Sequence, residues 1–97
     1  MTLAQFKISL KGTLPPDKIN ALLLSLWYDA KGNWNRAHET AQDITGRDGS
    51  WIHAYLHRKE GDLSNASYWY SIAGKPIPSS SLEEEWENIL KALIGRA

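Results

Sequence analysis

The chain has 97 residues, which is enough for one domain and too few for two. Hydrophobic residues (42%) and charged residues (23%) occur in the proportions of a folded globular protein rather than a disordered segment. Eleven basic residues balance eleven acidic ones, which argues against a nucleic acid or an anionic membrane as partner, because both require a cationic surface. The absence of cysteine excludes disulfides, thiolate metal sites and cysteine nucleophiles.

No segment has the pattern of a targeting or membrane sequence. The first residues, MTLAQFKISLKG, lack the apolar core of a signal peptide. The longest apolar run, ALLLSLW at 21–27, is too short to cross a bilayer. We therefore expect a cytoplasmic protein.

The N-terminal segment 1–14 shows an alternating pattern. Phe6, Ile8 and Leu10 are separated by polar residues, and this period of two predicts an extended conformation. No second strand is evident elsewhere to pair with it. The segment therefore either lies across the rest of the domain as irregular chain or pairs with the same segment of another copy.

Glycines and capping residues divide the remaining chain into helices. Pro15-Pro16-Asp17 predicts the start of a helix, since proline suits a first turn and an acid complements the helix dipole. Asn33 and Asp62 are N-cap residues that each follow a glycine. The expected helices cover about 16–31, 33–45, 49–60, 62–73 and 82–94. They group into a first hairpin at 16–45, a second at 49–73, a linker at 75–81 and a C-terminal capping helix within 82–95.

An internal repeat supports this division. Residues 32–44 and 61–73 align so that Ala37 corresponds to Ala66. Each unit is preceded by a helix with a small residue seven positions before the glycine, Ser25 or Ala54. Small residues at matching points let paired helices approach closely. The expected fold is all-α, with two stacked antiparallel helical hairpins and a terminal helix that covers the exposed end.

The second hairpin resembles a tetratricopeptide repeat. The residues at the family's spacing are Gly61, Asp62, Ala66, Tyr70, Ala73 and Pro78, with a partial match at Tyr28, Gly32 and Ala37. The run from LWYDAKGNW to YWY is also similar to a family of short, single-domain microbial proteins of uncharacterised function. The repeat resemblance implies a helical scaffold that binds peptides or proteins in a concave groove.

In that register one face of the first helices would line the groove. Its expected members are Trp51, Tyr55, Arg58 and Lys59, with Leu22, Leu26 and Asp29. Aromatic anchors beside basic residues suit an acidic peptide or a chain terminus. The alternative is that the N-terminal segment or the last helix covers the aromatic residues.

Three histidines are the other candidate site. His53 and His57 are four residues apart on one helix face with Glu60, a spacing that suits two metal ligands. The residue after His53 is Ala54, not the glutamate of a zinc peptidase. No other catalytic motif is present, so the sequence favours a protein that is not an enzyme.

The tetratricopeptide resemblance also implies a place for His38. It follows the helix-contact alanine, and that position in the family faces the first helix of the next repeat, which here carries His53 and His57. The three side chains are then expected to meet between the hairpins, with Glu39 and Glu60 nearby. Three interpretations remain open: a hydrogen-bonded seam, a divalent metal site, or a small-ligand pocket with histidine as acid or base.

The sequence thus leads to two hypotheses. The first is a helical scaffold, without a cofactor, that acts through a protein or peptide partner or through a second copy of itself. The second is a divalent-metal or small-ligand binding protein centred on the histidines.

Overall fold

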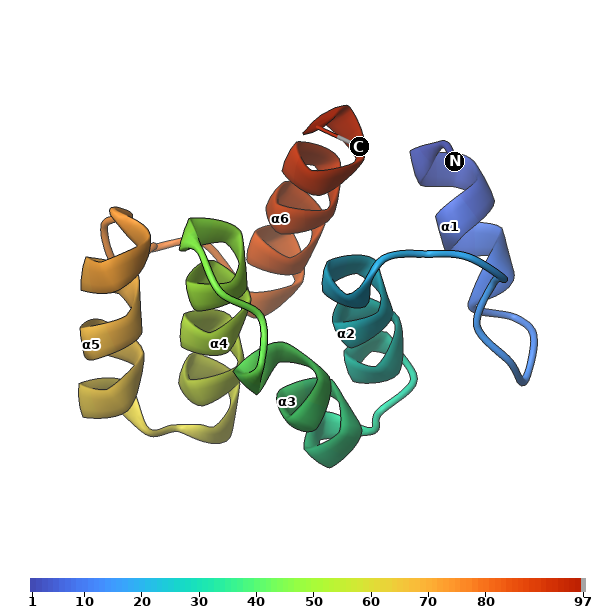
Figure 1. Ribbon diagram of the computed structural model, residues 1–97. Helices are drawn as coiled ribbons and strands as arrows, with labels where there is room; N and C mark the ends of the chain where they lie inside the picture. The colour runs from blue at the N-terminus through green and yellow to red at the C-terminus, as the bar shows by residue number, and fades with distance from the viewer. Residues whose placement is uncertain (97) are drawn as a thin grey trace.

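The computed structural model describes residues 1–96, and this part of the chain is all-helical (Figure 1). Its helices are α1 (Leu3–Ser9), α2 (Ala21–Ala30), α3 (Trp34–Gln42), α4 (Arg47–Glu60), α5 (Leu63–Ala73) and α6 (Leu82–Arg96). The expected all-α class is confirmed. No helix within residues 1–96 has the length and apolar character needed to span a membrane.

Helices α2 and α3 form one hairpin and α4 and α5 form another, joined through contacts between α3 and α4 (Figure 1). The small residues predicted at the contacts are buried. Ser25 Oγ donates a hydrogen bond to the Ala37 carbonyl at 2.8 Å. In the second hairpin Ala54 and Ala66 lie in one buried cluster with Tyr70. Close helix pairing therefore rests on the residues that the repeat singled out.

The N-terminal prediction was wrong over residues 3–9, which form helix α1 instead of an extended segment. A capping box starts this helix, because Thr2 Oγ1 accepts from the Gln5 amide at 3.0 Å and Gln5 Oε1 accepts from the Thr2 amide at 2.8 Å. Phe6 is fully buried, whereas Ile8 is 63% exposed. The apolar residues that pack inward have helical spacing, so the alternation at 6, 8 and 10 was misleading.

Other helix boundaries differ by a few residues. The first hairpin begins at Ala21, not at 16, because Asn20 is the N-cap and its side chain accepts from the Leu23 amide at 2.9 Å. Asn33 and Asp62 cap α3 and α5 as predicted. Ser81 Oγ also accepts from the Glu84 amide at 3.1 Å, at the start of α6.

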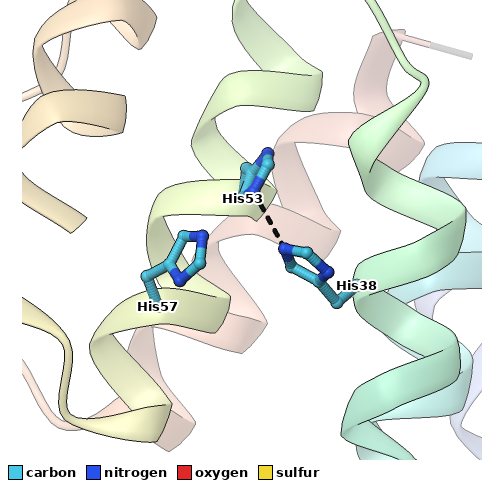
Figure 2. A group of neighbouring side chains, drawn as sticks. All are labelled: His38, His53 and His57. Carbon is cyan, nitrogen blue, oxygen red and sulfur yellow. Dashed lines mark hydrogen bonds between the residues drawn. The ribbon is translucent and has the colours of Figure 1, made fainter. Parts of the chain in front are cut away.

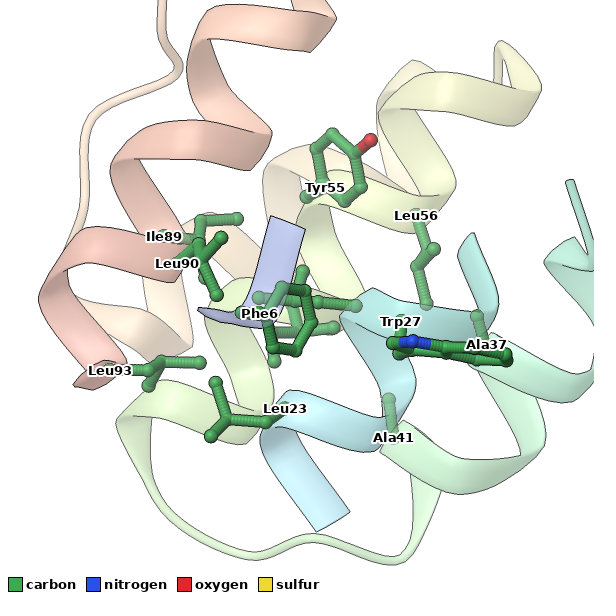
Figure 3. Close-up of a cluster of buried hydrophobic side chains, with 12 residues drawn as sticks. Phe6, Leu23, Trp27, Ala37, Ala41, Tyr55, Leu56, Ile89, Leu90 and Leu93 are labelled. Carbon is green, nitrogen blue, oxygen red and sulfur yellow. The ribbon is translucent and has the colours of Figure 1, made fainter. Parts of the chain in front are cut away.

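Helix α6 differs from the expected capping helix in where it packs. It lies against α2 and α4 rather than extending the stack beyond α5, and α1 packs onto it (Figure 1). Phe6 sits between side chains of α2 and α6 at the centre of the main core (Figure 3). The buried members of this core are Phe6, Leu23, Leu26, Trp27, Ala37, Ala41, Ile52, Tyr55, Leu56, Ile89, Leu90 and Leu93. The core therefore draws on both ends of the chain.

The start of α4 packs tightly against the turn before it. A Cβ atom on Gly49 would lie 2.5 Å from the Ile44 carbonyl oxygen and 2.9 Å from Ile44 Cγ2. We expect Gly49→Ala to reduce the free energy of unfolding by about 1–3 kcal/mol, measured by urea denaturation. Gly95→Ala in α6 is the matched control, because a Cβ there meets nothing within 4 Å. An equal loss in both variants would contradict the packing explanation.

Candidate metal centre

His38, His53 and His57 converge between the two hairpins. His38 projects from α3, and His53 and His57 project from successive turns of α4 (Figure 2). One ring nitrogen from each histidine lies within 4.8 Å of the others. His53 and His57 are buried and His38 is half-buried. We call these three residues the histidine trio.

His38 and His53 are in direct contact. Their Nε2 atoms are 3.0 Å apart, which is hydrogen-bonding distance (Figure 2). Two neutral imidazoles can make this bond only if one Nε2 carries hydrogen and the other presents its lone pair. A metal ion placed between them would replace that hydrogen, and both rings would then carry hydrogen on Nδ1. The two Nε2 atoms therefore face one another and can either share one hydrogen or present two lone pairs.

Glu60 orients the third histidine. His57 Nδ1 lies 2.6 Å from Glu60 Oε1, so Nδ1 donates to the carboxylate and the lone pair of Nε2 remains available. A carboxylate that holds the second nitrogen of a ligating histidine is the usual partner of histidine metal ligands. The other acidic residue expected nearby, Glu39, is exposed on α3 and lies outside the trio.

Two tryptophans, Trp34 and Trp69, border the trio. The sequence had not indicated either of them as part of the site. Trp34 stacks on His38 with ring centroids 4.9 Å apart, and Trp69 stacks on His53 at 4.1 Å. Trp34 Nε1 also donates to the Leu56 carbonyl at 2.8 Å, which fixes its ring. Trp34 lies four residues before His38 in the sequence, so its place beside His38 on one helix face could have been predicted. Trp69 comes from α5, and no local pattern connects it to the histidines.

Burial favours the uncharged forms of His38 and His53 at neutral pH. Desolvation, together with the neighbouring His38 and His57 rings, lowers the pKa of His53 from 6.5 to about 4. Desolvation and His57 also lower the pKa of His38, against smaller opposing effects of Glu60 and Glu39. Metal ions bind the neutral imidazole. Protons therefore compete weakly with a metal ion for His38 and His53 at pH 7.

A second group of possible ligands shares His57. A nitrogen of His57 and carboxylate oxygens of Glu60 and Asp62 also lie within 4.8 Å of one another. Glu60 and Asp62 are exposed, and Asp62 Oδ1 already accepts from the Asn65 amide as the N-cap of α5. Water therefore competes for both carboxylates, and the histidine trio is the more buried donor set.

The residues proposed for a groove share one face, but helix α6 packs over it. Leu26, Tyr55 and Asp29 are buried, and Leu22 and Trp51 are partly buried against the core. Trp51 Nε1 donates to Glu85 Oε2 of α6 at 3.3 Å. The structure thus matches the alternative in which the last helix covers the aromatic residues.

The basic residues of that face are paired internally. Arg58 Nη1 lies 2.8 Å from Glu85 Oε1, and Lys59 Nζ lies 2.9 Å from Asp29 Oδ1. Arg58 also donates to the Ser80 carbonyl. Neither cation is therefore free to attract an acidic peptide in this conformation.

Comparisons with known proteins do not assign a function to the histidine trio. The chain matches no protein-family model, no curated protein and no solved structure. The trio, Glu60 and the two neighbouring tryptophans must therefore be interpreted from their own chemistry.

Proposed function

We propose that this protein binds a divalent first-row transition metal ion through His38, His53 and His57. The observation that supports the proposal is the convergence of three ring nitrogens within 4.8 Å of one another at the junction of the hairpins. Imidazole nitrogens from two helices that meet in a partly buried position provide the donors of a three-histidine site.

The distances suit such an ion after a small adjustment. Zinc binds imidazole nitrogen at about 2.0–2.1 Å, so tetrahedral ligand nitrogens lie about 3.3 Å apart. The His38–His53 separation of 3.0 Å is close to that value. The nitrogens of the trio lie within 4.8 Å of one another, so His57 would have to move closer to the other two rings for all three to bind one ion.

The donor chemistry narrows the choice of ion. Three nitrogen ligands suit zinc, copper or nickel, whereas magnesium and calcium prefer oxygen ligands. Three protein ligands leave a fourth position of a tetrahedral ion for water or another small ligand. Zinc is the ion that we choose for the first test.

Metal binding at this position would also stabilise the fold. His38 belongs to the first hairpin and His53 and His57 to the second, so a bound ion would link α3 to α4. An ion that binds only the folded state raises the free energy of unfolding by about 2.7 kcal/mol at one hundred times its dissociation constant.

The proposal is tested by calorimetric titration of metal-free protein with zinc, together with elemental analysis of protein purified without added metal. We expect one zinc per chain and a higher melting temperature in its presence. X-ray absorption should find three imidazole nitrogens at about 2.0 Å from the zinc. If zinc neither binds nor shifts the melting temperature, the trio is a hydrogen-bonded seam and the proposal fails.

Three variants separate specific binding from surface binding. His38→Gln changes a half-buried residue and should abolish stoichiometric binding. Glu60→Gln should weaken binding about 10- to 100-fold, because it removes the carboxylate that orients His57. Glu39→Gln is the matched control: Glu39 is exposed and acts on His38 only through its charge, so the affinity should change much less than in Glu60→Gln. An equal effect of Glu39→Gln and Glu60→Gln would point to nonspecific electrostatics.

We also propose that the hairpins stack in the manner of tetratricopeptide repeats and bind a protein or peptide partner. The specific support is the outer face of α5, where Tyr68 (60% exposed) and Ile72 (44% exposed) are four residues apart and so adjacent. This surface is distinct from the face covered by α6.

Self-association is the first form of this second function to test. Sedimentation equilibrium should show a concentration-dependent dimer that Tyr68→Ser and Ile72→Ser together abolish. Leu63→Ser, also at an exposed apolar residue but on the opposite side of α5, is the control. A monomer at every concentration would exclude association between copies.

A further inference from the structure

A pocket of about 400 Å³ lies on the other side of α4 from the histidine trio. It opens between the end of α2, the second half of α4, the start of α6 and the residue after α1. Its lining residues are Leu10, Asp29, Ala30, Tyr55, Lys59, Leu82, Glu83 and Trp86. Its volume falls in the range of small-molecule sites, and its wall is mainly apolar with a few polar groups.

Asp29 is the buried polar group of this pocket, with only 3% of the residue exposed. Oδ2 accepts from the Tyr55 hydroxyl at 2.7 Å, and Oδ1 accepts from Lys59 Nζ at 2.9 Å. Burial and the Asp29 charge raise the pKa of Tyr55, so its hydroxyl stays protonated and donates. Each carboxylate oxygen can accept a second hydrogen bond. Asp29 therefore has acceptor capacity left beside the pocket.

A similar buried carboxylate elsewhere in the fold has more donors around it and lies outside the pocket. Glu85 also combines a buried carboxylate with a tyrosine and a basic residue, but it accepts from Tyr70, Trp51 and Arg58. Three donors therefore surround the Glu85 carboxylate, whereas two surround that of Asp29. Glu85 does not line the pocket, whereas Asp29 does. Of these two buried carboxylates, only Asp29 is therefore placed to meet a ligand in the pocket.

The charges around the pocket favour a cation. Asp29 and Glu83 carry two negative charges, and Lys59 is the single basic residue in the lining. Asp29 also lies in the last turn of α2, where the helix dipole is negative and stabilises positive charge. Lys31 does not line the pocket, and its ammonium donates to the carbonyls of Leu10 and Gly12.

The apolar part of the pocket lining indicates that the ligand also has an apolar body. Leu10, Leu82 and Trp86 supply apolar surface, and Trp86 is held in place because its Nε1 donates to the Leu26 carbonyl at 3.1 Å. We propose that this pocket binds a small organic ammonium ion, with its N–H groups on Asp29 and its apolar body against Leu82 and Trp86. The site is independent of the histidine trio.

The test uses three probes of similar shape and different charge: 2-phenylethylammonium, 2-phenylethanol and 3-phenylpropanoate. Each is titrated into metal-free protein at pH 7 and followed by ¹H–¹⁵N chemical shifts. We expect the ammonium probe to bind with a dissociation constant of about 1 mM, as a small ligand with one charged contact would. The shift changes should centre on Lys59, Leu82 and the Trp86 indole, with at least about fivefold weaker binding of the other probes.

Variants identify the groups responsible. Asp29→Asn should weaken the ammonium probe about tenfold. Asp29 is buried, so two further variants change surface residues of the same pocket. They test the site even if Asp29→Asn does not fold. Ala30→Leu, at the exposed end of α2, should narrow the pocket and weaken binding, and Glu83→Gln should weaken it about twofold. Glu84→Gln lies outside the pocket and is the matched control.

Different results would support the site, overturn the ligand class or overturn the site. Weaker binding in Glu83→Gln and Ala30→Leu but not in Glu84→Gln supports the assignment. Equal or tighter binding of 3-phenylpropanoate overturns the ammonium class. Absence of saturation up to about 20 mM ammonium probe, or shift changes centred away from the pocket, overturns the site. None of these results depends on whether the histidine trio binds zinc.

Discussion

Replacing Glu85 with alanine is expected to reduce the free energy of unfolding by about 3–5 kcal/mol, the cost of leaving one partner of a buried ion pair alone. Glu85 Oε1 lies 2.8 Å from Arg58 Nη1, and the Tyr70 hydroxyl lies 2.8 Å from Oε1 and 2.6 Å from Oε2, so its one hydrogen is shared between the two oxygens. Trp51 Nε1 donates to Oε2 at 3.3 Å. The variant would leave buried donors without an acceptor.

The same carboxylate connects three helices. It projects from α6 and binds two residues of α4 and one of α5, so its loss should loosen the docking of α6. Burial and Glu85 raise the pKa of Tyr70, which keeps its hydroxyl a donor at neutral pH. Urea denaturation of wild type and variant measures the difference.

Glu83→Ala is the control for this experiment. Glu83 lies two residues away on the same first turn of α6 but is exposed. We expect its free energy of unfolding to change by no more than about 0.5 kcal/mol. If Glu83→Ala and Glu85→Ala are equally destabilised, the effect arises from the helix dipole and not from the buried contacts.

The second large effect is the loss of stability of the metal-free protein in mild acid. The pKa of His53 is about 4 in the folded protein and 6.5 in the unfolded chain. Above pH 6.5 neither state binds this proton. Between pH 6.5 and 4 the unfolded chain takes up a proton that the folded protein does not, so stability falls as pH falls. The expected loss from pH 7 to pH 5 is about 2 kcal/mol from His53 alone.

His38 should add to this loss, because its pKa is also lowered on folding. Urea denaturation in the presence of EDTA at several pH values between 7 and 5 measures the slope. This range lies above the titration of ordinary carboxylates. His53→Gln should be less stable at pH 7 but should show a shallower pH dependence. A wild-type curve that is flat from pH 7 to 5 would contradict the assigned environment of His53.

Most of the helical framework could be predicted from the sequence because its determinants are local. Asn33 and Asp62 each cap a helix directly after a glycine, and Gly61 adopts a positive φ of 89° between α4 and α5. Ser25 and Ala37 meet at a hairpin contact that the internal repeat predicted. Such signals depend on a few neighbouring residues and on one repeated spacing.

The N-terminal helix was not predicted because two local patterns in this segment conflict. Its capping box, Thr2 with Gln5, is a local signal that was present in the sequence. The alternation of Phe6, Ile8 and Leu10 competed with it and favoured an extended segment. Only burial of Phe6, set by α2 and α6, shows which of the two patterns faces the core.

The candidate metal site was also predicted only in part. The spacing of His53 and His57 predicted a shared helix face, and the resemblance to a tetratricopeptide repeat implied that His38 meets it; the three rings do converge. The aromatic wall from Trp69 could not be predicted, because a helix-to-helix stacking contact has no sequence period.

The sequence by itself determined the helical hairpins, most of their caps and close contacts, and the shared face of His53 and His57, because each depends on local conformation or repeated spacing. Only the tertiary structure decided where α6 lies. Its docking on α2 and α4 buries Tyr55 and pairs Arg58 with Glu85. It also encloses the pocket beside Asp29. That position depends on apolar burial and ion pairing between residues far apart in the chain, which no local pattern encodes.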